Sequence, residues 1–518
     1  MSDYDEAASS IHRRGAEPSL IQSFSIEGLW GYRSIALASE YAATILIAKN
    51  GSGKTTLLGA LDAFLRMQLS RLRNLEFSEI RCKLRGEDDE LVLSHNDVVE
   101  FLQVPGDGDL IKLASRASIE PAMLFNFLVD EWNADEPYAN AIPVLEEKAF
   151  GAILSAFNYN HREAVDALNK AYTSLMERQL TVAKISKILK RALAGIEVVY
   201  LPTYRRVELA LRGEAREAPH RRRRPRFDVA AGSLFTGQIQ FGLSDIAERL
   251  SQLNQQIILD SNNGYRNISA NIINELLDGT FDNYVPSDSD VTSPEELKIF
   301  FDRLEIGSRQ ARYMPPVSVP FLDKVYSGEG VPESSRRFLN YFLTKLARVI
   351  RSTKDVELLV DGFINSCNKY LLLQEPSTII SGDNDGARVL DGKSLRVNRS
   401  NLRVRVESVP DGRRISLDAL SSGEKQMISL FAKIFLYPQR KIVLIDEPEL
   451  SLSIDWQRHI LVDVLSAPLC SQLIAITHSP FVFDNELEPF ARALKLGRVI
   501  GPDRARETEE EALGDLDV

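Results

Sequence analysis

The sequence has few cysteines and histidines and no long hydrophobic run. Its three cysteines, Cys82, Cys367 and Cys470, are odd in number and far apart, which excludes a disulfide framework and a zinc site built on them. None of its six histidines forms a pair at the spacing of a metal-dependent nuclease. No apolar run approaches the ~18 residues of a membrane span, and the N-terminus lacks the apolar core of a signal peptide. We therefore expect a cytoplasmic protein with no membrane partner.

The chain also lacks an excess of positive charge. Lysine and arginine number 62 against 73 acidic residues, and the formal net charge is −11. A nucleic-acid partner would therefore have to contact a local basic patch. The composition, with 44% hydrophobic and 26% charged residues, is that of an ordinary globular protein and excludes collagen-like or wholly disordered chains. The 518 residues are enough for about three domains.

A glycine-rich turn follows the apolar run at 43–48 and leads into an amphipathic segment from Lys54 to about Leu72. This order predicts a buried strand, a loop and a helix whose N-terminal N–H groups point at an anion. The glycines let the backbone curl around phosphate oxygens, and Ala48 in place of the first glycine is a modest departure from the phosphate-loop pattern. Lys54 can reach the β- and γ-phosphates, and Thr55 can ligate Mg²⁺. We predict that ATP is bound by Asn50, Gly51, Ser52, Gly53, Lys54, Thr55 and Thr56.

A second pattern, Lys441-Ile-Val-Leu-Ile-Asp-Glu-Pro448, predicts a central strand that ends at a ligand site. Two adjacent acids at the end of a buried strand are costly unless a cation and a partner neutralise them. Asp446 is the candidate that supports Mg²⁺. Glu447 is the candidate that orients or deprotonates the attacking water.

A third pattern, Leu420-Ser-Ser-Gly-Glu-Lys-Gln426, lies about twenty residues earlier. Ser421 and Gly423 open a helix, which gives a second N-terminus suited to an anion. The pattern by itself is also a good helix cap. Because the phosphate loop already provides one γ-phosphate site, a second such helix end is explained if it serves a nucleotide held by another copy of the chain.

Arginines are concentrated between residues 204 and 226, with five of them in the six residues from 221 to 226. Such a cluster attracts phosphates in an otherwise acidic protein. Two interpretations stay open, a solvated loop and a nucleic-acid contact, and the scarcity of aromatic residues argues against base stacking. The candidate contacts are Arg205, Arg206, Arg221, Arg222, Arg223 and Arg224.

The patterning along the chain divides it into successive segments. Leu243, Ile246, Leu250, Leu253 and Ile257 form a stripe of only about two heptads, which fits an ordinary packed helix or a short helical arm. The last residues carry many acids and no apolar periodicity, as in a solvated tail. The predicted segments are a flexible N-terminus at 1–18, an ATPase N-lobe at 19–110, a helical insertion at 111–194, a core strand at 195–206, a helical insertion or arm at 207–375 with a basic loop at 203–226, an ATPase C-lobe at 376–500 and an acidic tail at 501–518.

The order of phosphate loop, LSSGEKQ, DEPE and a strand ending in Thr477-His-Ser-Pro480 resembles the ATP-binding-cassette (ABC) ATPases. It is most similar to their branch with RecF, the chromosome-maintenance heads and the overcoming-lysogenisation-defect ATPases. The resemblance implies an α/β fold, an ABC-type ATPase head with a mixed sheet, a phosphate loop and large helical insertions. It further implies that Glu447 is the catalytic acid/base, that His478 senses the γ-phosphate, and that Thr55 and Asp446 hold the metal. Nucleotide contacts are implied for Arg33 and, from a sister chain, for Ser421, Ser422, Gly423 and Glu424.

Within that branch, the stretch from Tyr200 to Arg206, together with LSSGEKQ and THSPF, is most similar to the PtuA ATPases of Septu antiphage defence, including those encoded with retrons. The resemblance implies a homodimer or higher homo-oligomer that hydrolyses ATP with Mg²⁺ and gates a separate HNH nuclease, PtuB. In retron versions the ATPase also holds the reverse transcriptase and its DNA–RNA product. Nothing after His478 supplies a nuclease metal cluster, so we expect the effector on another polypeptide. Two alternatives remain, a RecF-like DNA-repair ATPase and a nucleotide-switched scaffold with little turnover.

Overall fold

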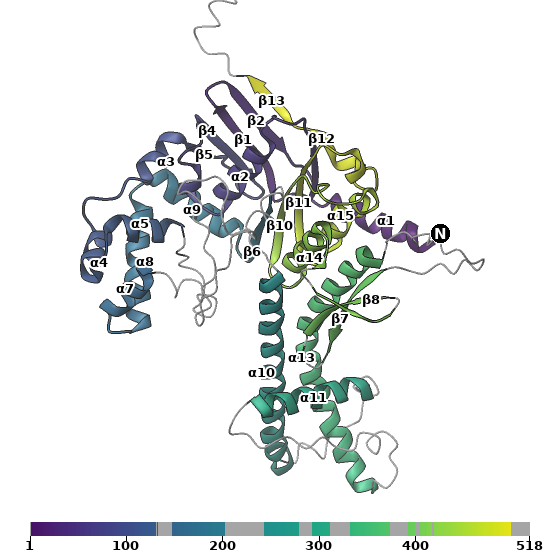
Figure 1. Cartoon of the computed structure of the whole chain (residues 1–518). Coiled ribbons are helices and arrows are strands. Elements are labelled where there is room, and N and C mark those ends of the chain that lie inside the picture. Colours follow the sequence, from purple (N-terminus) through teal and green to yellow (C-terminus); the bar gives the residue numbers. More distant parts are fainter. Residues whose placement is uncertain are drawn as a thin grey trace, which may run out of the picture. The chain divides into compact units, whose positions relative to one another are not determined.

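The computed structural model describes residues 2–130, 132, 148–202, 243–278, 293–310, 332–372, 392–399, 401, 403–409, 411–416 and 419–498. The chain divides into two compact units (Figure 1). The first comprises Met1–Gln240 and Gln439–Val518, and the second comprises Phe241–Pro438. The candidate arginines of the basic stretch, from Arg205 to Arg224, and the acidic tail lie outside the described residues.

A five-stranded parallel sheet forms the centre of the first unit, with the strand order β12-β3-β11-β10-β6. Its strands are Ala491–Ala493 (β12), Ala43–Ile47 (β3), Cys470–Thr477 (β11), Arg440–Asp446 (β10) and Ile196–Leu201 (β6). Strands β3, β10 and β11 are nearly continuous apolar runs, as expected for parallel strands buried on both faces. Because neighbouring strands run in one direction, the loops that follow β3, β10 and β11 all start from the same edge of the sheet.

A second sheet of the first unit is antiparallel and has the order β13-β2-β1-β4-β5. Its strands are Lys495–Arg498 (β13), Arg33–Ala38 (β2), Ile21–Leu29 (β1), Glu79–Leu84 (β4) and Leu91–Ser94 (β5). Strands β4 and β5 confirm the hairpin that the alternating pattern at 78–94 predicts.

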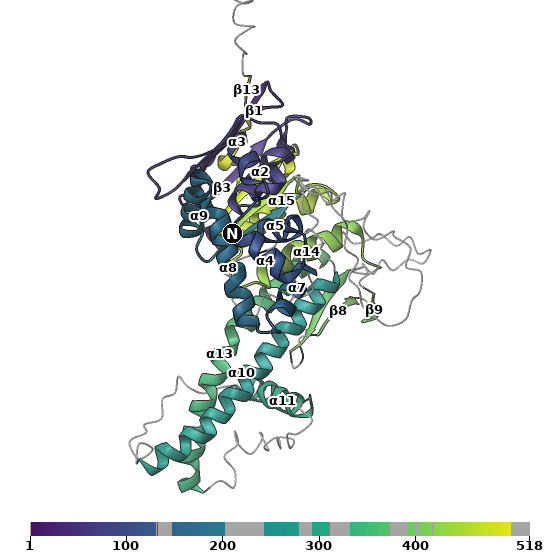
Figure 2. The same cartoon turned by 90° about the vertical axis from the view of Figure 1, so that its left-hand side faces the viewer.

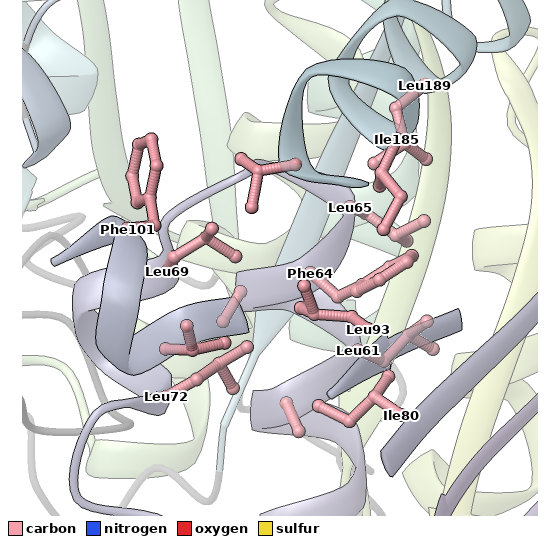
Figure 3. Close-up of a cluster of buried hydrophobic side chains, with 14 of the residues drawn as sticks. Leu61, Phe64, Leu65, Leu69, Leu72, Ile80, Leu93, Phe101, Ile185 and Leu189 are labelled. Atoms are coloured by element: carbon pink, nitrogen blue, oxygen red, sulfur yellow. The ribbon is translucent and has the colours of Figure 1, made fainter. Parts of the chain in front are cut away.

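Helix α2, Lys54–Leu65, packs against strands of both sheets. Its buried side chains join those of β4, β5 and the neighbouring helices in one hydrophobic core (Figure 3). The helix was expected to continue to about Leu72, but it ends at Leu65. Met67 has a positive φ of 56°, which breaks the helical path, and a short 3₁₀ turn, Leu69–Leu72, follows.

Further helices belong to the first unit, and those at 121–130 and 148–192 confirm the helical pattern predicted from about 121 to 194; residues 131 and 133–147 of that range lie outside the described residues. In this group α8 buries Ala164, Leu168, Ala171 and Leu175, one face of an amphipathic helix. The described helices here are His95–Phe101 (α3), Asp109–Ala117 (α4), Pro121–Asp130 (α5), Lys148–Ala156 (α7), His161–Glu177 (α8) and Leu180–Ala192 (α9).

The N-terminal segment differs from the expectation of a flexible chain at 1–18, because Ser2–Gly15 forms helix α1. Helix α1 packs against α15, Ile454–Ser466. Arg14 of α1 donates hydrogen bonds to the carbonyl oxygens of Ser466 (2.8 Å) and Ala467 (2.5 Å) at the end of α15. The last carbonyls of a helix have no partner within it, so a basic side chain from another segment stabilises them. The polar N-terminal sequence by itself does not predict this long-range contact.

The second unit contains two long helices, α10 at Leu243–Leu277 and α13 at Glu333–Leu372, which lie side by side and antiparallel (Figures 1 and 2). The stripe residues Ile246, Leu250, Leu253 and Ile257 are buried, as both interpretations of the stripe require. A Cβ on Gly264 would lie 2.4 Å from Val349 Cγ1, so glycine is what allows α13 to approach α10 at this point. The remaining elements are α11 at Pro294–Gln310, α14 at Ser422–Phe435 and a three-stranded antiparallel sheet of Lys393–Asn398 (β7), Arg403–Ser408 (β8) and Arg414–Ile415 (β9).

The predicted α/β class with large helical additions is confirmed by this architecture. Within the described ranges, no helix combines the length and the apolar character needed to cross a bilayer.

Candidate nucleotide-binding and catalytic site

The phosphate loop connects β3 to α2. Gly51 and Gly53 have φ angles of 78° and 91°, in the left-handed region that glycine adopts without steric cost. A Cβ on Gly53 would lie 3.3 Å from Ile35 Cδ1, so this part of the loop is packed against β2, whereas a Cβ on Gly51 would meet nothing within 4 Å. Gly53 is the N-cap of α2 and supplies no side-chain hydrogen bond. The first N–H groups of α2 are thus left for an anion, as expected at a phosphate loop.

Lys54 and Glu447 form an ion pair although they are 393 positions apart in sequence. Lys54 Nζ lies 2.7 Å from Glu447 Oε1, and the two side chains are 5% and 17% exposed. The ammonium also donates to Asn50 Oδ1 at 3.2 Å. The lysine predicted to bind phosphate and the carboxylate predicted to be catalytic therefore neutralise each other.

Thr55 and Asp446 are also in direct contact. Thr55 Oγ1 donates to Asp446 Oδ2 at 2.5 Å, and Asp446 is fully buried at the end of β10. A hydroxyl and a carboxylate are hard oxygen donors, and Mg²⁺ binds through few protein oxygens together with waters and substrate phosphates. These two residues therefore fit Mg²⁺ that arrives with a nucleotide.

Glu447 has an unusual backbone. Its φ is +51°, a left-handed conformation that costs a non-glycine residue roughly 1–2 kcal/mol. Its N–H donates to Ile476 O of the neighbouring strand β11 at 2.8 Å. Strain of this kind is often found at functional sites, where the surrounding structure maintains it.

His478 follows β11, and its Nδ1 lies 2.9 Å from Glu449 Oε1 and 3.7 Å from Glu447 Oε1. The structure therefore brings the histidine to the carboxylate predicted to be catalytic. Glu449 was not among the predicted site residues. The third acid of the DEPE pattern could have indicated it, because it lies only two positions after Glu447.

Arg33 is also close to the phosphate loop, because its Nη1 donates to Gly51 O at 3.1 Å. Its guanidinium lies 5.6 Å from the centre of the Trp30 ring and 5.4 Å from that of the Tyr32 ring. These cation–π contacts hold the side chain at the loop. The two aromatic residues were not predicted as neighbours of Arg33.

The segment Ser421–Glu424 belongs to the second unit, whereas the site residues described above belong to the first. Ser421 caps α14, with its Oγ accepting from Glu424 N at 3.2 Å, and Glu424 Oε2 accepts from Ser421 N at 2.7 Å. This reciprocal pair is a capping box. Ser422 and Gly423 are the first two residues of α14.

The Glu424 carboxylate has a second partner that the sequence did not reveal. Lys393 Nζ of β7 lies 2.8 and 2.9 Å from its two oxygens, and the Glu424 side chain is only 2% exposed. The carboxylate therefore holds the N-terminus of α14 in place, and the N–H groups of that helix end are what the segment offers to an anion.

Comparison with protein families gives one match. Residues 329–484 match the family described as "AAA domain, putative AbiEii toxin, Type IV TA system". The matched segment includes Ser421, Asp446, Glu447 and His478 and does not include the phosphate loop. The chain thus carries an AAA-like ATPase domain. No curated protein matches the chain significantly.

Several solved structures are similar to the chain at low identity, two of them Smc heads. The Smc head domain with an extended coiled coil, bound to the C-terminal domain of ScpA and derived from Pyrococcus furiosus, is 14% identical with a TM-score of 0.32, and the match covers 95% of this chain and 99% of that chain. The SmcHead bound to the C-winged helix domain of ScpA is 12% identical with a TM-score of 0.33, covering 94% and 100%. These TM-scores correspond to a loose superposition.

Proposed function

We propose that the protein is a Mg²⁺-dependent ATPase of the ABC type, in which two copies each complete the nucleotide site of the other. The observation that carries this proposal is that Lys54 contacts Glu447 and Thr55 contacts Asp446. The two acids come from a distant part of the chain, since Asp446 ends strand β10 and Glu447 follows it. Phosphate-binding and water-activating groups must lie this close for phosphoryl transfer to water.

Nucleotide binding would rearrange the Lys54–Glu447 pair. The loop N–H groups and the Lys54 ammonium would bind the phosphates, and the ammonium would then be shared with or lost by Glu447. The released carboxylate could accept a proton from the attacking water. Binding of the triphosphate would in this way convert a neutralised glutamate into a general base.

Thr55 and Asp446 would hold Mg²⁺ at the triphosphate. Bound Mg²⁺ would neutralise charge on the β- and γ-phosphate oxygens. Arg33, whose Nη1 lies 3.1 Å from Gly51 O, would add a positive charge at the loop, and His478, 3.7 Å from Glu447, would contact the terminal phosphate. These side chains therefore orient the triphosphate for in-line attack.

The α14 N-terminus would supply the second half of the site from a sister chain. Its capping box leaves the N–H groups of Ser422 and Gly423 at the helix end, where the helix dipole favours an anion. ATP would then bridge two copies in a homodimer or higher homo-oligomer. Hydrolysis would remove the bridging charge and open the assembly.

The biological role that we propose is control of a separate effector in cytoplasmic antiphage defence. The support is the resemblance of LSSGEKQ, THSPF and the stretch from Tyr200 to Arg206 to Septu PtuA ATPases. The ATP-bound assembly would retain an HNH nuclease of the PtuB type and release it after hydrolysis. In a retron-associated version it would also hold the reverse transcriptase and its DNA–RNA product, with the arginines at 205–206 and 221–224 as candidate nucleic-acid contacts.

The test compares the wild-type chain with Lys54→Ala and Glu447→Gln. We expect Mg²⁺-dependent ATP hydrolysis by the wild type, a loss of about 10²–10⁴-fold in turnover with Glu447→Gln, and loss of ATP binding with Lys54→Ala. Light scattering should show ATP-dependent self-association, most strongly for Glu447→Gln. A chain that stays monomeric with ATP and Mg²⁺, or that does not bind ATP, would refute the proposal.

The biological part needs a second assay, co-purification with the protein encoded beside the gene. An HNH nuclease whose retention changes with nucleotide or with Lys54→Ala supports the antiphage role. ATP-dependent DNA binding without a nuclease partner would instead favour a RecF-like repair ATPase. If Glu447→Gln retains and releases its partner as the wild type does, a nucleotide-switched scaffold with little turnover would be favoured.

A further inference from the structure

Three polar groups converge on one oxygen of Glu449. Its Oε1 lies 2.9 Å from His478 N, 3.2 Å from Ser479 N and 2.9 Å from His478 Nδ1. The side chain is 5% exposed. A carboxylate so deeply buried is costly unless hydrogen-bond donors compensate its charge, and here the donors come from the segment that carries the γ-phosphate sensor.

Gln457 of α15 makes a second connection between the same two segments. Its Nε2 donates to Leu452 O at 3.0 Å and to Glu449 O at 3.3 Å, while its Oε1 accepts from Ser479 Oγ at 2.9 Å. The turn after β10 and the turn after β11 are therefore joined by the side chains of Glu449 and Gln457. This connection is separate from the ladder between the strands.

We infer that Glu449 is a positioning residue, which acts through His478 on the hydrolysis step; the inference rests on the proposed function. Glu449 lies two positions after Glu447, so its contact with His478 sets the separation of the histidine from the catalytic carboxylate, 3.7 Å between Nδ1 and Oε1. Glu449 Oε1 also lies 2.9 Å from the ring nitrogen Nδ1, and this contact restrains the imidazole beside Glu447.

Neither Glu449 nor Gln457 belongs to the phosphate-binding set. The hydrogen bonds of the phosphate loop described above join Lys54 to Asn50 and Glu447, and Thr55 to Asp446. Among the described bonds, none of these loop residues contacts Glu449. Loss of Glu449 should therefore leave ATP binding almost intact and slow the chemical step. Displacement of a catalytic group by about 1 Å can cost on the order of 10²-fold in rate.

The test measures kcat, KM and ATP affinity for Glu449→Ala, Glu449→Gln and His478→Ala, with Glu40→Gln as a control at an exposed carboxylate of the same unit. We expect Glu449→Ala to lower kcat about 10–100-fold, with ATP affinity within about threefold of wild type. Glu449→Gln retains an acceptor of the same size and should lose less. The decisive variant is Glu449→Ala/His478→Ala, which should be no slower than His478→Ala alone, because one residue acts through the other.

Each outcome decides the matter. Multiplied losses in the double variant, or a wild-type kcat for Glu449→Ala, would overturn the positioning role. If Glu449→Ala does not fold, Glu449→Gln is used in its place, and a kcat for Glu449→Gln/His478→Ala that falls below that of His478→Ala by the full loss measured for Glu449→Gln would overturn the role in the same way. A wild-type chain that hydrolyses no ATP would instead refute the proposed function on which the inference rests.

Discussion

Removing a site residue usually weakens ligand binding, but the Lys54–Glu447 ion pair predicts the opposite. The variant Glu447→Gln should bind ATP more tightly than the wild type. In the wild-type chain the ammonium must leave, or share, a carboxylate 2.7 Å away before it can serve the phosphates. Two unit charges about 4 Å apart interact by about 4 kcal/mol at an effective dielectric constant of 20. Desolvation of a pair whose members are 5% and 17% exposed offsets a large part of this attraction. We therefore expect competition from Glu447 for the Lys54 ammonium to weaken ATP binding by a net ~1–2 kcal/mol.

That free energy corresponds to about a 5–30-fold increase in affinity. Isothermal titration calorimetry with ADP, and with a non-hydrolysable ATP analogue, should be done in EDTA so that neither hydrolysis nor Mg²⁺ contributes. Glu40→Gln is the matched control, since it removes the charge of another paired carboxylate of the first unit, 3.1 Å from Arg492, and leaves the Lys54–Glu447 pair in place. An affinity for Glu447→Gln that equals or falls below that of the wild type would show that Glu447 does not compete for the ammonium.

Three further outcomes are expected. Lys393→Met removes the ion-pair partner of the buried Glu424 carboxylate, so the free energy of unfolding should fall by about 1–3 kcal/mol. Glu424→Gln in the same chain should restore part of this loss, and thermal unfolding without any loss would contradict the prediction. Hydrogen bonds from Lys345 and Tyr341 lower the pKa of Glu275. The stabilisation that this gives is complete above the ordinary carboxyl pKa and is lost as the pH falls below it, through the lowered pKa of the folded chain, so acid unfolding should become less steep in Glu275→Gln. Burial raises the pKa of Cys470 to about 12 and that of Cys82 further. Iodoacetamide at pH 8 should therefore label the cysteines only in denaturant. Rapid labelling of the native chain would be inconsistent with their burial.

The elements around the phosphate loop could be predicted because their signals are local. An apolar run, glycines with positive φ and an amphipathic segment determine β3, the loop and α2 within about twenty residues of sequence. The same holds for β10 and the acids at its end. The helix end at Leu65 was missed, because the turn at Met67 continues in an apolar segment that still has helical spacing.

The expectation of a flexible N-terminus at 1–18 was wrong for a different reason. Ser2–Gly15 is polar, and its contacts with distant segments, such as those of Arg14 with carbonyls more than 450 positions away, show why it is held as a helix. Propensity is a weak guide where tertiary contacts stabilise an element. Glu449, Gln457 and Lys393 were missed on the same ground, since their partners are distant in sequence or unremarkable by residue type.

The sequence by itself determined which residue types can bind a triphosphate, which strand carries the two acids, and the α/β class of the fold. Those features follow from backbone sterics, hydrophobic burial and the chemistry of single side chains, all of which act over short stretches. Only the tertiary structure decided that Lys54 neutralises Glu447, that Glu449 holds His478, and that Lys393 holds Glu424. Such pairings depend on which buried charge lies within hydrogen-bonding distance of which other group. That distance is set only when helices and strands far apart in the sequence pack together.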